Sequence, residues 1–296
     1  MANENGAELR QVIAQITGID PVVAMDLNSI AGGFRAIDTR EAQLAAAATS
    51  VAQPTKIALI GVYGGLTPRG SWYGSSLAAI AEMASRAESD PDVASAIVDI
   101  DSPGGTVAYT PEAASAVASL ASKKPVVAVV NTLAASAAYW IASQASEIVM
   151  TPSADVGSIG AMMIHQDISG WLDQIGLKLT IIRSEQSPMK NEAHPFAPLS
   201  DEARAFLQAR ADAAGGDFIK AVAAGRKVSQ AKVKEDFGQG RVFGAREAIA
   251  RGMADRVATL GDVVSGMLPK PSQRTRASRR RSALAFDSDP PLTVWL

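Results

Sequence analysis

The sequence predicts an α/β fold with a parallel sheet, mainly because two kinds of segment alternate along the chain. From Lys56 onward, short runs of β-branched and apolar residues alternate with amphipathic stretches of helical period. The apolar runs are continuous, which is typical of strands covered on both faces. Hydrophobic residues make up 47% and charged residues 20% of the 296-residue chain, as in a globular protein. We therefore expect a parallel sheet built from repeated ββα and βαβ units.

The first part of this region predicts three strands separated by two helices. The strands are expected at IALIGV (57–62), VASAIVDI (93–100) and PVVAVV (125–130). The helices are expected over Ser75–Glu88 and Pro111–Ser122, where the apolar residues recur with helical spacing.

The second part continues the alternation and then becomes helical. A helix is expected over Ser136–Ser146, a strand at EIVM (147–150), a helix over Ile168–Ile175 and a strand at LKLTIIR (177–183). Gly176 is placed to end the preceding helix. Ser200 is a helix-capping residue before a long helix to about Ala224, and shorter helices follow as a helical C-terminal part.

Changes in composition divide the chain into three parts. We interpret residues 1–54 as an N-terminal arm of loosely packed helical character, residues 55–264 as the folded domain and residues 265–296 as a flexible basic tail. The tail contains the arginine cluster RTRASRRR (274–281). A solvated linker is favoured there over a docking segment for nucleic acid or an acidic partner, because short basic runs often occur without a binding role.

Charge and composition exclude several classes of function. The formal net charge is −2, so no general attraction to nucleic acid or anionic lipid is expected. No apolar run is long enough to span a bilayer and no secretory signal is visible, so a cytoplasmic location is expected. The chain has no cysteine, which excludes disulfides, a thiol nucleophile and cysteine-based zinc sites. No metal or other cofactor is expected.

Two strand ends carry candidate site residues. Gly104 and Gly105 follow the strand 93–100 in a turn, where backbone N–H groups can point into a cleft and contact an oxyanion or an extended peptide. Ser136 lies where the next strand runs into a helix through small residues, so free helix N–H groups and open space would surround its hydroxyl. Taken singly, the first is more often an ordinary turn and the second a helix cap.

Two loops complete the set of candidates. Ser158 lies in a glycine-spaced loop, where its hydroxyl could orient a neighbouring polar group or simply complete a tight turn. Lys190 lies in a polar loop after the predicted strand 177–183, and a neutral lysine can act as a general base. His165 and His194 are the only histidines. A Ser–His pairing through His194 therefore stays open.

Four motifs follow one another along the chain: the Ser-Pro-Gly-Gly turn, the Ala-Ser-Ala-Ala-Tyr junction, the Gly-Ser-Ile-Gly loop and the lysine before a Pro-Phe loop. In this order they resemble the signal peptide peptidase A family of serine proteases. The resemblance covers roughly residues 56–262. The length and the N-terminal sequence look most like the phage capsid assembly proteases, which mature a procapsid. The resemblance implies a ClpP/crotonase-like fold, no cofactor, and scaffold or capsid proteins as substrates.

The resemblance also implies roles for individual residues. Ser136 would be the nucleophile, Lys190 the general base, and Ser158 the hydroxyl that holds the lysine amine. Gly104 and Gly105, with the N–H of Ala137, would contact the oxyanion and the substrate backbone. The resemblance to single-unit members of the family implies a ring-like homo-oligomer in which the serine and the lysine can come from adjacent subunits.

Three alternatives remain at the level of the sequence. One is a cellular protease similar to signal peptide peptidase. Another is a crotonase-like acyl-thioester enzyme, which would use the glycine-turn N–H groups and need neither Ser136 nor Lys190. The third is a non-catalytic assembly protein, because Ala137 and Ala138 stand where many members of the family have two glycines.

Overall fold

The computed structural model describes residues 22–25 and 56–267 of the chain. In its first half the elements are β1 (Val22–Met25), β2 (Lys56–Leu66), α3 (Leu77–Ser89), β3 (Val93–Thr106), α4 (Thr110–Lys123), β4 (Val126–Ala135), α5 (Ala137–Ala142) and β5 (Glu147–Met150). They are followed by β6 (Asp155–Gly157), β7 (Met162–Met163), α6 (Ser169–Gln174), α7 (Asp201–Gly225), α8 (Gln230–Asp236), β8 (Val242–Gly244), α9 (Ala245–Arg251), β9 (Arg256–Val257) and α10 (Leu260–Met267). The chain divides after Leu260 into two units.

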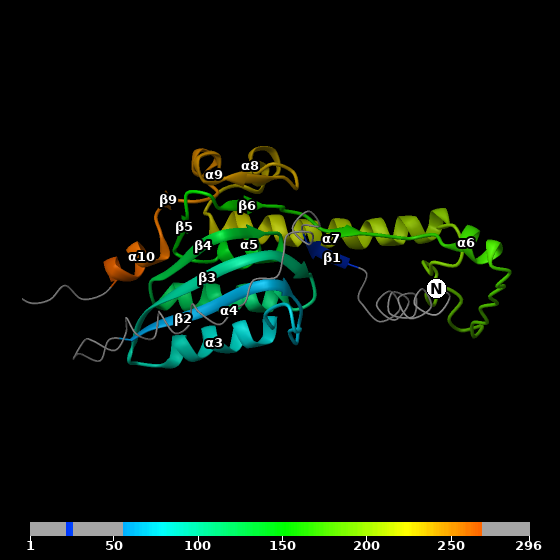
Figure 1. Ribbon diagram of the computed structural model, residues 1–296, viewed down its shortest axis with the longest axis horizontal. Helices are drawn as coiled ribbons and strands as arrows, with labels where there is room; N and C mark the ends of the chain where they lie inside the picture. Colours follow the sequence, from blue (N-terminus) through cyan, green and yellow to red (C-terminus); the bar gives the residue numbers. More distant parts are fainter. Residues whose placement is uncertain (1–21, 26–55, 268–296) are drawn as a thin grey trace, which may run out of the picture. The chain divides into compact units, whose positions relative to one another are not determined.

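The described strands form one sheet, and its central part is parallel. The strands β2, β3, β4, β5 and β9 pair in parallel, whereas β1 pairs antiparallel with β3 and with β7. Figure 1 shows α3 and α4 side by side below β2 and β3. Parallel neighbours need a crossover connection, and the helices supply it. The predicted parallel α/β class is therefore confirmed.

Both faces of the central strands are buried, which explains why their sequences are continuous apolar runs. On β3, Ala96, Val98 and Ile100 belong to the main core cluster. Ile97, between them, points to the opposite face and is 1% exposed. A helix on this sheet needs only one apolar side, and α3 buries Leu77, Ile80, Ala84 and Ala87 at intervals of three or four residues.

Two of the predicted elements are wrong. LKLTIIR (177–183) is not a strand, and no described strand pairs with it. Its backbone leaves the sheet after α6 and lacks the neighbouring strand whose hydrogen bonds a β-strand requires. The N-terminal arm lies outside the described residues except for β1, and this piece is a strand where helical character was predicted. The predicted tail lies outside them from residue 268 onward.

A partly buried ion pair, with the side chain of Arg226 9% exposed and that of Asp255 37% exposed, holds the end of α7 to the sheet. Both terminal nitrogens of Arg226 bind the carboxylate of Asp255, at 3.0 and 2.6 Å. The backbone N–H of Ile148 in β5 donates to the same carboxylate at 2.7 Å. Burial raises the pKa of Asp255, but the hydrogen bonds from Arg226 and Ile148 and the charge of Arg226 outweigh burial and hold this pKa below its ordinary value.

Asp255→Asn should therefore lower the free energy of unfolding at pH 7 by roughly 1–3 kcal/mol, because Arg226 would stay buried without its partner. A carboxyl whose pKa is lower in the folded state stabilises the fold above about pH 4 and loses that effect as pH falls through the folded pKa. The difference between wild type and variant should shrink toward pH 3. Urea unfolding of wild type and variant at pH 7 and at pH 3 measures this difference in the free energy of unfolding. Asp92→Asn, in an exposed pair with Lys56, is the control and should change little.

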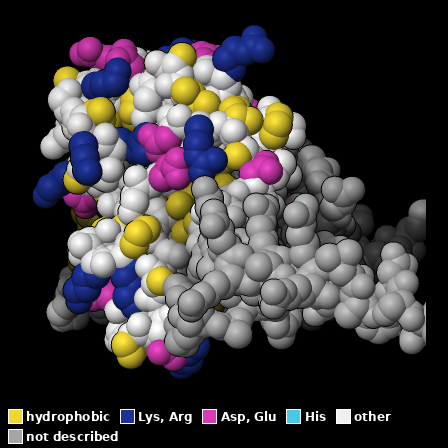
Figure 2. All heavy atoms as spheres, turned by 90° about the vertical axis from the view of Figure 1, so that its left-hand side faces the viewer, with side chains coloured by type: hydrophobic (Ala, Val, Ile, Leu, Met, Phe, Trp, Pro, Cys, Tyr) yellow, Lys and Arg dark blue, Asp and Glu magenta, His cyan; other side chains and the backbone are white. Residues whose placement is uncertain are grey.

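The surface carries charges of both signs. Figure 2 shows Lys and Arg side chains interspersed with Asp and Glu on one face. Among the described helices, none combines the length and the apolar character that a membrane span requires.

Candidate active site

Ser136 lies at a strained turn between β4 and α5. Its φ is 54° and its ψ is −124°, a backbone conformation that a residue with a side chain rarely adopts. Such a conformation costs on the order of 1–3 kcal/mol and persists only where the surroundings enforce it. Ser136 is 1% exposed, and within the described part of the chain its Oγ has no hydrogen-bond partner. Buried hydroxyls are nearly always hydrogen-bonded, so this Oγ is unusual and is available for another partner.

The helix after Ser136 is fixed from several sides. All six residues of α5 are buried. The hydroxyl of Tyr139 donates to the carbonyl of Met253 at 2.9 Å, and burial raises the pKa of this phenol. The ring of Trp140 stacks on Phe218 of α7 with centroids 4.6 Å apart. These contacts hold the first turn of α5 still, so the N–H of Ala137, which the helix itself cannot use, keeps its place beside Ser136.

The glycine turn at the end of β3 is organised by Ser102. Its Oγ donates to the carbonyl of Gly64 at 2.7 Å and accepts the N–H of Gly104 at 3.1 Å. The N–H of Gly104, expected to contact an oxyanion, is therefore used inside the turn in this structure. No role for Ser102 was predicted from the sequence. Its hydroxyl binds a carbonyl of β2, a strand distant in the chain, and no local pattern reveals such a contact.

Gly105 has no room for a side chain. A Cβ at this position would overlap the carbonyl oxygen of Leu66 in β2, to which Gly105 is paired. Gly105→Ala should push β2 away and lower the free energy of unfolding by about 1–3 kcal/mol. Gly216→Ala is the matched control, since a Cβ there meets no atom within 4 Å. It should stabilise α7 by up to about 1 kcal/mol. Chemical denaturation of both variants measures these effects. A Gly105→Ala variant with the free energy of unfolding of wild type would contradict the close approach of β2 to Gly105.

Ser158 lies directly beside Ser136 along the backbone. Gly157 at the end of β6 pairs with Ala135, and its carbonyl accepts the N–H of Ser136 at 2.8 Å. Ser158 follows with a φ of 55°, and its own N–H donates to the carbonyl of Arg241 at 2.9 Å. The structure thus brings together two of the predicted residues, each at a positive φ, on adjacent strand ends.

Lys190 is not brought to Ser136 within one copy of the chain. It is exposed, and its Nζ makes no hydrogen bond or ion pair with a described residue. The Nε of Arg183 donates to its carbonyl at 2.6 Å. This segment precedes α7, whose Phe218 packs on α5. Phe218 lies seventeen residues after Asp201 along the helix, a rise of about 26 Å. Figure 1 shows α6 where α7 begins, well away from α5.

The two histidines lie in the same segment as Lys190. A ring nitrogen of His165 is 3.1 Å from the carbonyl oxygen of His194, and Nδ1 of His194 accepts the N–H of Phe196 at 3.2 Å. Burial, followed by the charges of Arg183 and His165, lowers the pKa of His194. In the described part of one copy of the chain neither histidine contacts Ser136, as is also true of Lys190.

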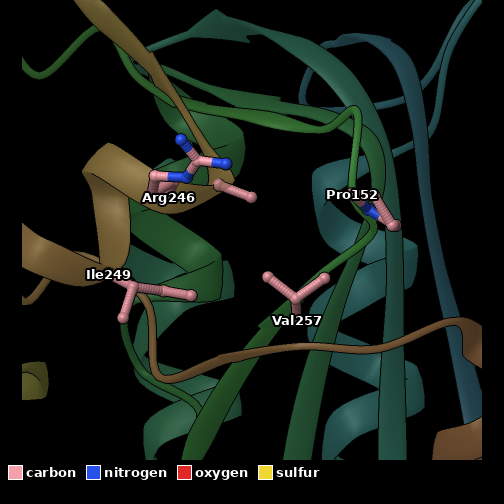
Figure 3. A pocket seen from close by; sticks show the side chains of 5 residues that line it. Pro152, Arg246, Ile249 and Val257 are labelled. Carbon is pink, nitrogen blue, oxygen red and sulfur yellow. The ribbon is translucent and has the colours of Figure 1, made fainter.

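One hollow of the described surface lies apart from these residues. A shallow hollow of about 360 Å³ is lined by Pro152, Ala245, Arg246, Ile249 and Val257. Figure 3 shows the labelled side chains converging from α9, β9 and the loop after β5. None of these residues belongs to the predicted site. Among the residues with described positions, no cluster of His, Asp or Glu has the arrangement of a metal site.

Comparison with known proteins gives a family match and several relatives. The model of peptidase family S49 matches residues 118–270. Capsid assembly protease C of Escherichia phage lambda is 35% identical over 182 residues, which cover 62% of this chain and 40% of that protein. Protease 4 of Salmonella typhi is 32% identical over 177 residues, or 60% of this chain and 28% of that protein. The chain thus spans well under two thirds of either relative.

A solved structure of the 1510-N membrane-bound stomatin-specific protease aligns with a TM-score of 0.44 at 18% sequence identity. The alignment covers 73% of this chain and 85% of that one.

Proposed function

The chain belongs to peptidase family S49, and from this premise we propose that it is a serine endopeptidase in which Ser136 is the nucleophile and Lys190 the general base. The observation that carries the proposal is the buried Oγ of Ser136, which has no partner among the described residues and lies at a strained strand-to-helix turn. Strain of this kind is retained where it serves function. A crotonase-like enzyme or a non-catalytic assembly protein would have no use for it.

In the proposed reaction, Oγ of Ser136 adds to the carbonyl carbon of the scissile peptide bond and its proton passes to the neutral amine of Lys190. The carbonyl oxygen becomes an oxyanion, which the N–H of Ala137 stabilises. The protonated lysine then gives the proton to the leaving amine as the C–N bond breaks. Water, activated by the same lysine, hydrolyses the acyl-serine ester. Ser158, beside Ser136, accepts a hydrogen bond from the lysine amine and positions it.

We propose that the dyad forms between copies of the chain. The segment that carries Lys190 exposes an unusual set of large apolar side chains: Ile164, Trp171, Ile175, Leu177, Leu179, Ile181, Ile182 and Met189. Large apolar side chains that are exposed together along one segment point to an interaction site. A second copy that covers this surface would carry Lys190 of one subunit toward Ser136 of the next. Residues 177–183 pair with no described strand of the same chain, and a strand formed there against a neighbour would be consistent with this arrangement.

For substrates, we propose scaffold or capsid proteins cleaved during procapsid maturation, in the host cytoplasm or the procapsid. The similarity to capsid assembly protease C of phage lambda supports this choice. The similarity to protease 4 of Salmonella typhi favours a cellular protease as the second candidate. Co-expression with the capsid and scaffold proteins encoded beside it, followed by mass spectrometry of the fragments, distinguishes the two. Unchanged capsid and scaffold chains would favour the cellular protease.

Labelling with a serine-reactive fluorophosphonate tests the chemistry directly. The expected product is one adduct per chain, found on Ser136 by peptide mapping. Ser143, at the opposite end of α5, is an internal control, because it is equally buried but its Oγ donates to the carbonyl of Trp140 at 2.7 Å. It should stay unmodified. An absence of any adduct on Ser136 under conditions in which the chain assembles would contradict the proposed function.

A further inference from the structure

The C-terminal end of β3 is paired on both of its edges. Gly104 and Gly105 pair with Gly65 and Leu66 of β2 on one edge. The same two glycines pair with Met25 and Ala24 of β1, in antiparallel orientation. Since a strand has only two edges, β1 must lie on the edge along which β4 pairs with the earlier part of β3.

β1 therefore continues the line of β4 beyond the point where β4 turns away. The last pair between β3 and β4 joins Ser102 to Ala134, and the chain leaves the sheet two residues later, at Ser136. On its far side β4 pairs with β6, and β1 pairs with β7, which follows β6 in the chain. Between β3 and β7, β1 fills the slot that opens where β4 ends.

The direction of β1 brings its carboxyl end to Ser136. Ser102 of β3 pairs with Ala134 of the parallel strand β4. Gly104 follows Ser102, and Ser136 follows Ala134, by the same number of residues, so Gly104 and Ser136 lie at the same level of the sheet. Met25 is the residue of β1 that pairs with Gly104. Because β1 runs antiparallel to β3 and β4, the chain enters the slot at Val22 and reaches the level of Ser136 at Met25. A substrate strand that entered the slot in the same direction would bring a peptide bond to the level of the hydroxyl.

We propose that the slot between β3 and β7 binds an extended substrate strand and that Val22–Met25 occupies it as an inhibitory segment of the same chain. This proposal rests on the proposed peptidase function. Backbone pairing with both walls gives such a strand affinity with little dependence on its sequence. The burial of Ser136, at 1% exposed, agrees with a site that a protein substrate cannot reach in this state.

The covalent connection between β1 and the rest of the chain makes the proposed inhibition effective and reversible. Residues 26–55 connect β1 to β2, so β1 is present at its slot at an effective concentration of about millimolar. A four-residue strand binds weakly by itself, and a substrate at a higher local concentration displaces it. Inside an assembling particle the substrate is at such a concentration and displaces β1. In dilute solution β1 stays bound in the slot.

A reversible cross-link tests the proposal, because the chain contains no cysteine of its own. Val22 and Met163 are paired across β1 and β7, so Val22→Cys with Met163→Cys places two thiols within reach of a disulfide. We expect the bond to form on oxidation. In the oxidised protein, hydrolysis of a fluorogenic peptide and fluorophosphonate labelling of Ser136 should fall about tenfold when nine tenths of the chains are cross-linked. Reductant should restore both.

The matched control combines Val22→Cys with Ser122→Cys, which is exposed near the end of α4. It should form no internal disulfide and show the same rates before and after reductant. A cross-linked Val22–Met163 protein that hydrolyses peptide as fast as its reduced form would overturn the inhibitory role. Failure of the disulfide to form would overturn the placement of β1. If the reduced protein and wild type both left Ser136 unlabelled, the proposed function itself would fail, an outcome distinct from the other two.

Discussion

Ser136→Ala should abolish proteolysis, with a fall in kcat/KM of more than about a thousandfold, and leave the fold intact. Loss of a nucleophile removes the covalent pathway and leaves only what the surrounding donors contribute. The hydroxyl makes no hydrogen bond to a described residue, so its removal breaks no stabilising contact. The free energy of unfolding should stay within about 0.5 kcal/mol of wild type or rise, because a buried polar group without a partner is destabilising.

Two further variants separate this loss of activity from damage to the fold. Ser136→Gly is also inactive, but it should be more stable than Ser136→Ala by about 1 kcal/mol, because glycine adopts the positive φ without strain. Ser143→Ala, which removes a bonded hydroxyl from the same helix, should keep activity and lose about 1 kcal/mol of stability. Thermal unfolding and peptide hydrolysis measure all three. Near-normal activity in Ser136→Ala would exclude Ser136 as the nucleophile.

A mixture of two inactive variants, Ser136→Ala and Lys190→Ala, should regain activity. If each site takes its serine from one subunit and its lysine from the next, random assembly of equal amounts makes a complete dyad at about a quarter of the interfaces of a closed ring. The mixture should therefore reach about a quarter of wild-type activity, whereas each variant alone stays inactive. Lys190→Ala removes only an exposed side chain and should leave stability unchanged.

Native mass spectrometry of the mixture provides the control, because it shows whether mixed oligomers have formed. If mixed oligomers form but no mixing ratio restores proteolytic activity, Ser136 and Lys190 of one site belong to the same subunit. His194→Ala should not reduce activity, since Nδ1 of His194 already accepts the N–H of Phe196 within its own loop. If it were the inactive variant, a Ser–His mechanism would replace the proposed one.

The sequence predicted those features that depend on local pattern. Strands buried on both faces leave continuous apolar runs, and β2 to β5 were recognised by them. The junction between a strand and a helix at Ser136 was predicted, but the open space expected around its hydroxyl is not found, because Ser136 is 1% exposed. Its positive φ could not be predicted, because Ser136 is held by a backbone bond to Gly157 from a strand twenty residues away.

The features that were missed depend on pairing partners distant in the chain. β1 is four residues long, too short to give a periodic signal, and its strand conformation comes from the edges of β3 and β7. The segment 177–183 shows the opposite error, since it has the composition of a strand and no partner within the described part of one subunit. The use of the Gly104 N–H by Ser102 likewise depends on β2, which places the Gly64 carbonyl beside Ser102.

The length of α7 has a mechanical consequence. Its C-terminal half is fastened to α5 by the stacking of Phe218 on Trp140 and by Gln144, whose amide nitrogen donates to the carbonyl of Ala221 at 3.1 Å. The helix extends about 26 Å from Phe218 to its first residue. A rotation of 5° about the fastened end moves the free end by about 2 Å, as much as separates a good hydrogen bond from none. In the proposed mechanism, the position of the Lys190 amine therefore has to be fixed by contacts near the first residue of α7.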